Sequence, residues 1–490
     1  MAVHPSAAHP IQFELNGAAT AVSGLPPTTT LLAYLREHAG LVGTREGCAE
    51  GDCGACSIAI LEIDPDLGSS WRTVNACLIL LPTVHGKTIR TIEGVGSTES
   101  PHCVQEALVR HHGSQCGYCT PGVVMSLFEA HHRTDLDEAW KFDDQLCGNL
   151  CRCTGYRSIR AALHEIAGRG ARNPTEVQNE HKPRTPGDVH YTHNNERFIR
   201  PQRWSQLWEA MDTYTDHTLV AGGTDLGLEV TKKHRRFPCL IGLDGLAELS
   251  QLSWRDGTFR VGATVRLSVL ERAASERLPM LARMLRYFGS RQIKNRATAG
   301  GNLCHASPVG DLAPVVLALG GALLLRSRES ERRVKAEDFF IGYRKTALRI
   351  GELLVAIELP LPAPGVHVGA YKVSKRRELD ISTTSAAFWV EVERSGIVAR
   401  ARIAFGGLAR TPRRAHRVET ALTGTPWCET GVVAAAAQLA HEFTPVDDVR
   451  GSAWYRLKLA QNLLLGFYHE TLSPRAAGPT PARPCGTVLP

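Results

Sequence analysis

The spacing of the cysteines constrains this chain more than any other feature. Eight of its fourteen cysteines form two sets in the first third of the sequence. The first set is Cys48, Cys53, Cys56 and Cys77, and the second is Cys116, Cys119, Cys151 and Cys153. Four thiolates are the ligand number of a [2Fe–2S] cluster, and C-x4-C-x2-C with a later fourth cysteine is the plant-type ferredoxin spacing. The sequence therefore predicts two clusters on one chain, and with them a route for electrons.

The sequence gives less support to other roles for these cysteines. Gly47, Gly51 and Gly54 allow the positive φ values with which a loop curls around a cluster. A zinc site usually combines two C-x2-4-C pairs, whereas the first set is a triplet with a lone partner. The C-x2-C pair of the second set, taken alone, also fits zinc or a redox dithiol. Cys147 is a rival ligand there, and the remaining thiols are expected to be buried or incidental: Cys103, Cys239, Cys304, Cys428 and Cys485.

Length and charge set broad limits. A chain of 490 residues should hold two to four domains. Its formal net charge of +7 is scattered, without the basic stripe expected of a nucleic-acid-binding protein. The longest apolar stretch, Leu312–Leu325, is shorter than the ~20 residues of a membrane span, so it is expected to be buried core. The first ten residues have no apolar signal region, so we expect a protein of the reducing cytoplasm, away from membranes.

Short patterns predict the local structure around the cysteines. Strands are expected at 11–15 and 57–63, and a helix at 30–38. The apolar period predicts helices at 101–110, 123–132 and 159–166, with the second cysteine set near helix starts. This favours a small α+β domain followed by a compact helical domain.

Two glycine-rich loops lie further along the chain. One is Leu219-Val220-Ala221-Gly222-Gly223-Thr224-Asp225-Leu226, and the other is Thr298-Ala299-Gly300-Gly301-Asn302. Paired glycines let backbone N–H groups approach a diphosphate, although an ordinary strand–turn–helix would also fit the first loop. The chain lacks G-x-G-x-x-G, so a Rossmann site is unsupported.

The cysteine segments are similar to those of the molybdenum hydroxylases, the xanthine dehydrogenase and aldehyde oxidase family. The segments of that family read close to EGC-x-EGDCGAC, QCG-x-CTPG and GNLCRCTGY, and this chain matches all three. Its departures, none of them a ligand, are Ala49, Ser57 and Ser158. The resemblance extends over roughly residues 11–470.

The resemblance implies a FAD site of the vanillyl-alcohol-oxidase/CO-dehydrogenase flavoprotein type. Leu219–Leu226 should hold the diphosphate, while Thr298–Asn302 and Asp311 should contact phosphate, ribose or adenine. Phe288 should lie near the isoalloxazine, Leu354 on the adenine side and Lys372 near the ring's polar edge. Core packing is the alternative for Phe288 and Leu354. The charged loop Lys375–Ile381 resembles one beside the flavin, although a solvated charge run is equally compatible.

The resemblance also gives the fold class, a multidomain α+β protein. A ferredoxin-like β-grasp [2Fe–2S] domain (9–92) precedes a four-helix [2Fe–2S] domain (93–166). A linker (167–195) leads to a two-part FAD-binding domain (196–365). A CO-dehydrogenase-flavoprotein-like C-terminal α+β domain (366–472) and a disordered tail (473–490) complete the expected order.

The same resemblance implies a function. The chain looks like the small, iron–sulfur/FAD subunit of bacterial xanthine dehydrogenase, with a large molybdopterin-binding partner and an (αβ)2 heterotetramer. Electrons from the partner's molybdenum cofactor should pass through the helical-domain cluster and the ferredoxin-like cluster to FAD and then NAD+. Purine hydroxylation needs no catalytic residue in this chain. Three alternatives stay open: an aldehyde or N-heterocycle hydroxylase subunit, a freestanding NAD(P)H-linked reductase, and a zinc-bound interaction module.

Overall fold

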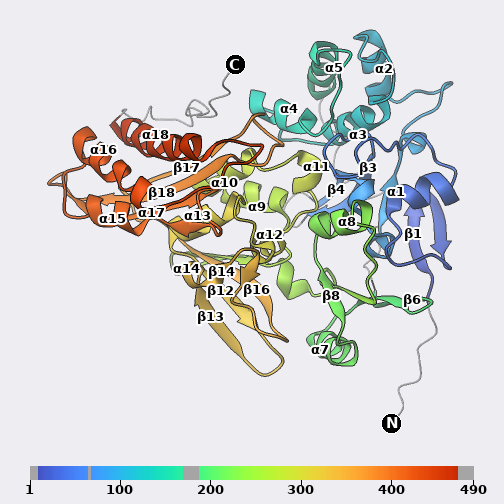
Figure 1. The fold of residues 1–490 in the computed structure, drawn as a ribbon. Coiled ribbons are helices and arrows are strands. Elements are labelled where there is room, and N and C mark those ends of the chain that lie inside the picture. Colours follow the sequence, from blue (N-terminus) through green and yellow to red (C-terminus); the bar gives the residue numbers. More distant parts are fainter. Residues whose placement is uncertain (1–8, 65–67, 169–186, 473–490) are drawn as a thin grey trace. The chain divides into compact units, whose positions relative to one another are not determined.

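The computed structural model describes residues 9–64, 68–168 and 187–472. Figure 1 labels the helices and strands. The chain forms two compact units. The first runs up to Ala247 and includes residues 290–297, and the second comprises residues 248–289 and 298–490. The division falls within the range expected for the flavin domain, so the two glycine-rich loops belong to different units.

The first domain of the first unit is a β-grasp sheet with strand order β2-β1-β5-β3-β4. Along β1, the residues Ile11, Phe13 and Leu15 are buried and alternate with more exposed positions, as predicted for a strand with one face on the core. Strands β1 and β5 are parallel, and the other pairs are antiparallel. The strand bounds are β1 Ile11–Leu15, β2 Ala18–Val22, β3 Ser57–Asp64, β4 Gly68–Asn75 and β5 Thr88–Arg90.

The helix predicted at 30–38 forms, but it changes type halfway. The Thr30 hydroxyl caps α1 (Leu31–Ala33) by accepting a hydrogen bond from the Ala33 N–H at 3.1 Å. The following segment, Tyr34–His38, is π-helical, with the Ala39 N–H bonded to the Tyr34 carbonyl. Three short 3₁₀ turns complete this domain: η2 Ala76–Leu78, η3 Leu81–Val84 and η4 Ile92–Gly94.

Four helices form the second domain around a nearly fully buried α3. They are α2 Cys103–Arg110, α3 Thr120–His131, α4 Ala139–Leu146 and α5 Arg157–Gly168. The apolar period predicted α2, α3 and α5. It did not indicate α4, because the buried side of that helix carries Asp144 and Gln145 in place of apolar residues.

A four-stranded sheet in the order β6-β7-β9-β8 completes the first unit. Its first strand corrects the predicted linker: Val189 and Tyr191 are buried on either side of the exposed His190, and β6 pairs antiparallel with β7. Residues 169–186 of that linker, and the predicted tail, lie outside the described residues. The elements are β6 Val189–His193, β7 Glu196–Arg200, α7 Trp204–Thr213, β8 His217–Val220, α8 Thr224–Thr231, β9 Cys239–Gly242 and α11 Arg291–Lys294.

The second unit contains a five-stranded sheet in the order β10-β11-β16-β12-β13. The predicted buried stretch becomes α13 and β12, and both are core elements. The 3₁₀ turn η5 Ala247–Ser250 precedes this sheet. The other elements are β10 Leu252–Arg255, β11 Thr258–Gly262, α9 Leu267–Ala274, α10 Pro279–Arg286, α12 Ala299–His305, α13 Leu312–Leu319, β12 Ala322–Arg326, β13 Glu331–Lys335, α14 Ala336–Phe339, β14 Phe340–Gly342, β15 Lys345–Thr346 and β16 Leu353–Pro360.

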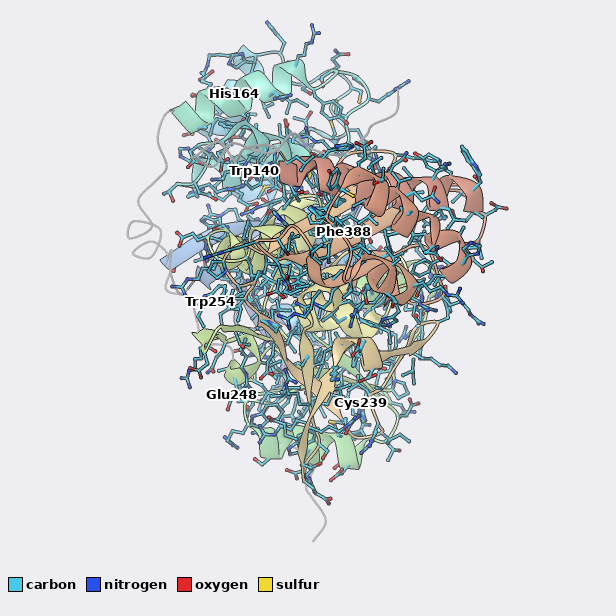
Figure 2. The ribbon with its side chains drawn as sticks, turned by 90° about the vertical axis from the view of Figure 1, so that its left-hand side faces the viewer. Trp140, His164, Cys239, Glu248, Trp254 and Phe388 are labelled. Carbon is cyan, nitrogen blue, oxygen red and sulfur yellow. The ribbon has the colours of Figure 1, made fainter. Side chains whose placement is uncertain are left out.

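The C-terminal part of the second unit packs helices on a sheet of order β17-β18-β19-β20. Phe388, labelled in Figure 2, lies in this core with Phe405 and Phe467. The elements are β17 His367–Val373, β18 Thr384–Val392, β19 Val398–Gly406, β20 Arg413–Arg414, α15 His416–Leu422, α16 Glu429–Ala437, α17 Leu439–Glu442 and α18 Ala453–Leu472. Within the described residues, every helix is too short or too polar to cross a membrane.

Candidate iron–sulfur and flavin sites

The first cysteine set converges at the end of the β-grasp sheet. Cys56 directly precedes β3 and Cys77 lies in η2, and their sulfur atoms are 3.3 Å apart. The Cys48 sulfur accepts hydrogen bonds from the backbone N–H groups of Glu50, Asp52 and Cys53 at 3.3–3.4 Å. A loop that points N–H groups at sulfur suits an iron–sulfur cluster. The donor set therefore fits the predicted cluster.

Backbone conformation explains two of the three glycines of this loop. The prediction was wrong for Gly47, which does not have a positive φ; there a side chain would lie 2.7 Å from the Cys53 sulfur. Gly51 and Gly54 have φ values of +82° and +68°, which side chains disfavour. Ala49 also has a positive φ of +53°. This is the position where the family usually has glycine, so the chain tolerates a left-handed alanine there.

Hydrogen bonding within each pair of the first set favours one thiolate, because the bond that lowers the pKa of one thiol raises the pKa of its partner, Cys53 or Cys77. The Cys53 thiol, more than the three backbone N–H groups, lowers the pKa of Cys48 to about 5 against the opposing effect of burial. The Cys77 thiol similarly lowers the pKa of Cys56. The thiolate is the form that binds metal.

The second set also comes together, at the surface of the helical domain. Cys119 is the N-cap residue of α3, and Cys151 and Cys153 lie just before α5. The Tyr118 N–H and then the Cys153 thiol lower the pKa of Cys116, whereas burial and then the Cys151 thiol raise the pKa of Cys119. Cys116 and Cys153 are exposed, whereas Cys151 is buried. The rival candidate Cys147 is the C-cap residue of α4, and its thiol donates to the Asp144 carbonyl at 3.3 Å.

The loops that carry the two sets touch each other. The Leu150 N–H donates to the Cys53 carbonyl at 3.0 Å, which places one hydrogen bond between a ligand of the first set and the neighbour of Cys151. The Asn149 side chain donates to the Gly54 carbonyl at 3.3 Å. A side chain at Gly54 would lie 2.1 Å from the Gly148 carbonyl oxygen, so only glycine permits this approach.

A buried charge network fastens α11 to the cluster domains. Glu129 is fully buried on α3, and its carboxylate lies 3.1 Å from Arg291 Nε and 3.8 Å from an Arg72 nitrogen. Lys294 Nζ lies 2.6 Å from the buried carboxylate of Asp144. Sequence reasoning missed this network, because its partners are up to 162 positions apart and no local pattern joins them.

The first glycine-rich loop forms a strand–turn–helix. Gly223 has a φ of +77° and begins α8 without a capping side chain, so its first-turn N–H groups suit an anion. A side chain at Gly222 would come 2.1 Å from the Arg296 carbonyl oxygen. The predicted diphosphate loop, Leu219–Leu226, thus has the open helix start that a phosphate needs.

Helix α8 rests on the first cysteine set. A side chain at Gly227 would meet the Cα and carbonyl oxygen of Leu78, the residue after Cys77, at 3.0 Å. At the end of α8, the Thr231 hydroxyl donates to the Ala49 carbonyl at 2.7 Å, and Lys232 Nζ donates to the Cys48 carbonyl at 2.5 Å. The helix that follows the predicted diphosphate loop therefore contacts both ends of the first cluster site.

The other predicted flavin residues belong to the second unit. Thr298 caps α12 by accepting from the Gly301 N–H at 3.2 Å, and a side chain at Gly300 would meet Ala263 at 2.6–2.8 Å. The preceding Ala299 is buried, and Asn302 is half-buried. This loop is therefore tightly fixed.

Asp311 and Lys372 come together as a buried ion pair, with Lys372 Nζ 3.0 Å from the Asp311 carboxylate. The Ser382 hydroxyl donates to the same carboxylate at 2.5 Å, and Lys372 also donates to the Tyr287 carbonyl, next to Phe288. Leu354 is only 4% exposed on β16, which suits its alternative role in core packing.

The charged loop 375–381 pairs its charges within itself. Arg376 lies 2.5 Å from the Asp380 carboxylate, and Arg377 contacts Glu378. Lys375 donates to the Val449 carbonyl at 2.9 Å. These contacts are those of a surface loop that is neutralised locally.

Family models match the chain in the predicted order. Residues 13–81 match a 2Fe-2S iron–sulfur cluster binding domain, and residues 91–164 match a [2Fe-2S] binding domain. Residues 193–362 match the FAD binding domain in molybdopterin dehydrogenase, and residues 369–471 match the CO dehydrogenase flavoprotein C-terminal domain. The chain is therefore an oxidoreductase of the iron–sulfur flavoprotein class, with two [2Fe–2S] domains and a FAD-binding domain.

Comparison with individual relatives identifies the family within this class of oxidoreductases. Xanthine dehydrogenase of Emericella nidulans and xanthine dehydrogenase/oxidase of Rattus norvegicus are each 32% identical over 94% of this chain. The chain spans 39% of the length of each. It belongs to the xanthine dehydrogenase family of molybdenum hydroxylases and has the iron–sulfur and flavin portion of that family.

Solved structures are similar in fold to about half of this chain. Carbon monoxide dehydrogenase from Hydrogenophaga pseudoflava matches with a TM-score of 0.52 and 27% identity, over 56% of this chain and 96% of that one. Quinoline 2-oxidoreductase from Pseudomonas putida 86 matches with the same score and identity, over 55% and 94%.

Proposed function

We propose that this chain is the electron-transfer subunit of an NAD+-dependent xanthine dehydrogenase. A partner chain with a molybdenum cofactor would oxidise hypoxanthine and xanthine to urate, and this chain would carry the electrons to NAD+. Support comes from the relatives named xanthine dehydrogenase, which align with 94% of the chain. The chain's own part is to hold the redox groups at fixed positions.

The single observation that carries the proposal is the continuous contact from one site to the next. The Leu150–Cys53 hydrogen bond joins the two cysteine loops. Helix α8, which follows the predicted diphosphate loop, packs on Leu78 and bonds to the Cys48 and Ala49 carbonyls. These contacts support the proposed order of second cluster, first cluster and flavin.

The exposure of the cysteines supports electron flow in the same direction, from the second set towards the flavin. In the second set Cys116 and Cys153 are exposed, whereas in the first set Cys56 and Cys77 are buried. A groove of about 380 Å³ near the second set is lined by Ser114, Thr120 and Pro121 together with the apolar residues Ile92, Leu108, Val109 and Val124. Exposed apolar surface of this kind favours a protein partner, and the molybdenum-containing chain is the partner we assign to it.

The candidate ligands have distinct chemical roles. When bound, iron–sulfur clusters carry single electrons, and FAD couples them to the two-electron chemistry of NAD+. We assign the first cluster to Cys48, Cys53, Cys56 and Cys77, and the second to Cys116, Cys119, Cys151 and Cys153. FAD is assigned to 219–226, 298–302, Phe288, Asp311, Leu354 and Lys372. The chain supplies thiolates, an uncapped helix start and fixed loops.

A second candidate function is the same role in an enzyme that oxidises another N-heterocycle or an aldehyde. The structural match to quinoline 2-oxidoreductase favours keeping it. The substrate pocket would lie in the partner, so the redox relay of this chain would be unchanged.

The decisive experiment isolates the tagged chain from its native cells and identifies the chain that co-purifies. We expect a molybdopterin-binding partner, an (αβ)2 mass by light scattering, and NAD+ reduction with xanthine. Activity with quinoline or an aldehyde and none with purines would select the second candidate. A chain that purifies alone and oxidises NADH with a dye would support a freestanding reductase and contradict the proposal. Comparing NAD+ with O2 in the same assay fixes the acceptor.

A further inference from the structure

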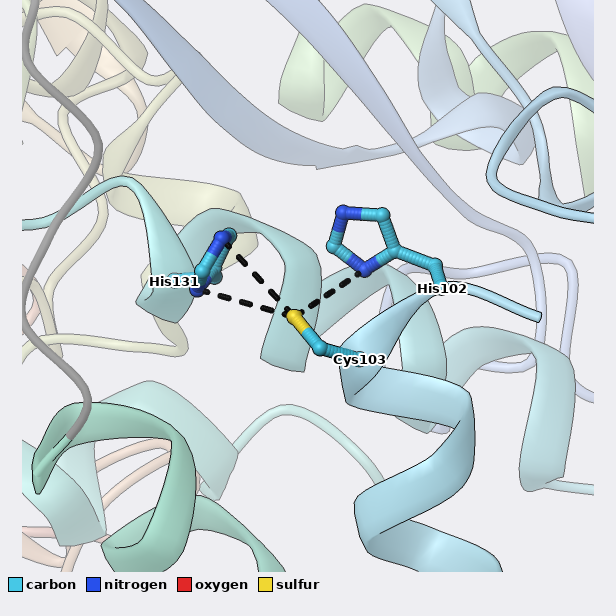
Figure 3. Close-up of side chains that lie close together, drawn as sticks. All are labelled: His102, Cys103 and His131. Atoms are coloured by element: carbon cyan, nitrogen blue, oxygen red, sulfur yellow. Dashed lines mark hydrogen bonds between the residues drawn. The ribbon is translucent and has the colours of Figure 1, made fainter. Parts of the chain in front are cut away.

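A thiol lies between two imidazoles at the junction of two helices in the second cluster domain. His102 is the N-cap residue of α2, Cys103 is its first residue, and His131 is the last residue of α3. The Cys103 sulfur is 3.6 Å from His102 Nδ1 and 3.8 Å from His131 Nε2 (Figure 3). One ligand atom from each residue lies within 4.8 Å of the other two, and all three residues are half-buried.

The two sulfur–nitrogen separations are close to those of a tetrahedral zinc site. With Zn–S near 2.3 Å and Zn–N near 2.0–2.1 Å, a tetrahedral angle puts sulfur and nitrogen about 3.6 Å apart. Small side-chain rotations would therefore bring both imidazoles within bonding distance of one ion. We propose that His102, Cys103 and His131 bind Zn²⁺, with water as the fourth ligand.

The ligands are held in place before any ion binds. The backbone N–H of His102 donates to Gln105 Oε1 at 2.8 Å in a capping box. His102 Nδ1 accepts from the Val104 N–H at 3.3 Å, so that nitrogen has its lone pair rather than a proton on the side of the Cys103 sulfur. The ion would replace this one long N–H···N bond. The His102 ring also packs against Phe128, with ring centroids 5.6 Å apart.

The donor set selects the class of ion. One thiolate with two imidazoles suits Zn²⁺ or Cu⁺ and not the oxygen-preferring Mg²⁺ or Ca²⁺. Two nitrogen ligands beside one sulfur match the ligand types of tetrahedral Zn²⁺. None of the three residues belongs to either cluster set, so the site is separate from the relay. Bound zinc would tie the start of α2 to the end of α3.

The test uses the full chain with its clusters and FAD, carrying no polyhistidine tag because such a tag would bind zinc. After dialysis against zinc with a competing chelator, elemental analysis should give about one zinc per chain beside unchanged iron. Cys103→Ser and His131→Gln should each lower zinc affinity at least ~100-fold. Loss of a residue that only hydrogen-bonds to a metal ligand costs about 10- to 100-fold, so a loss of this size indicates a direct ligand. Cys147→Ser, the matched thiol change in the same domain, should bind zinc like the parent chain.

Zinc K-edge absorption identifies where the ion is bound. One sulfur with two imidazole nitrogens and an oxygen supports the site. A four-sulfur environment would mean zinc in a cluster position and would overturn the proposal. So would zinc retained at full affinity in both variants, copper bound in preference to zinc, or no bound metal.

Discussion

At the scale of single residues, His85 makes stability depend on pH. Burial, then the positive charges of Arg200 and His9, lowers the pKa of His85 to about 4. An unfolded histidine has a pKa near 6.5, so between about pH 6.5 and 4 the unfolded chain binds a proton that the folded chain does not. Stability is therefore full above about pH 6.5 and falls as the pH drops. After discounting for solvent screening at this half-buried site, the loss is roughly 1–2 kcal/mol.

The check is the melting temperature of the parent chain and of His85→Gln between pH 7.5 and 5. Glutamine retains an acceptor for the Gln12 N–H, which His85 Nδ1 binds at 3.1 Å. The variant should show the smaller decrease in melting temperature. Equal decreases would show that another group is responsible.

Glu129 is expected to dominate the buried charge network. Burial raises its pKa, but Arg291, Arg72 and Arg133 together bring the pKa below its ordinary value, so the carboxylate is charged. Glu129→Gln leaves buried guanidinium groups without their counter-charge, and removing one partner of a buried pair costs about 3 kcal/mol or more. Calorimetry should show an earlier transition for the cluster domains.

Glu138→Gln is the matched control for this change. Its side chain is 50% exposed and its carboxylate lies 3.3 Å from Lys141 Nζ, so loss of this charge should cost under about 1 kcal/mol. Equal effects of the two substitutions would mean that the buried network contributes no more to stability than an exposed ion pair.

Residues that act through local spacing were predictable, and residues that act through tertiary contact were not. The cysteines of each set are identifiable because cluster chemistry requires fixed short intervals. Lys294 and Asp144 are 150 positions apart, and neither stands out in its own segment. The sequence predicts Cys103 to be an incidental thiol. Its contact with His131 arises from the packing of α2 against α3, which no local pattern indicates.

At the scale of elements, the crossing of α3 with the first cysteine loop depends on glycine. A side chain at Gly122 would lie 2.1 Å from the Gly54 carbonyl oxygen, and backbone cannot yield as a flexible side chain does. Gly122→Ala should therefore push α3 away and lower iron from about four to about two per chain or less. Gly466→Ala on α18, where nothing lies within 4 Å, should leave iron unchanged. Full iron in both variants would contradict this account.

Helices were predicted correctly where their buried side consists of apolar residues. Helices α2 and α5 present an apolar stripe to the core, and their period is visible in the sequence. Helix α4 buries Asp144 and Gln145, whose partners include residues of α3 and α11, so its buried face could not be recognised locally. Strand β6 was taken for linker because only Val189 and Tyr191 mark its buried side.

At the scale of the whole molecule, the relay predicts that the second cluster can be removed without disabling the flavin end. Cys116 is an exposed candidate ligand, whereas the first set and α8 are joined by contacts that do not involve it. In Cys116→Ser, NADH should still reduce FAD and the first cluster, since both lie beyond the break. If the proposed function holds, xanthine should no longer drive NAD+ reduction with the partner bound, because the proposed route of electrons begins at the missing cluster.

Reductive titration measures both effects. Two [2Fe–2S] clusters and FAD take up about four electrons, and Cys116→Ser should take up about three. Cys147→Ser, a nearby thiol outside the set that bonds to the Asp144 carbonyl, should behave like the parent chain. Xanthine:NAD+ activity that survives in a Cys116→Ser chain with only one cluster would mean that electrons enter elsewhere. The order of second cluster, first cluster and flavin would then be wrong, whatever partner the chain binds.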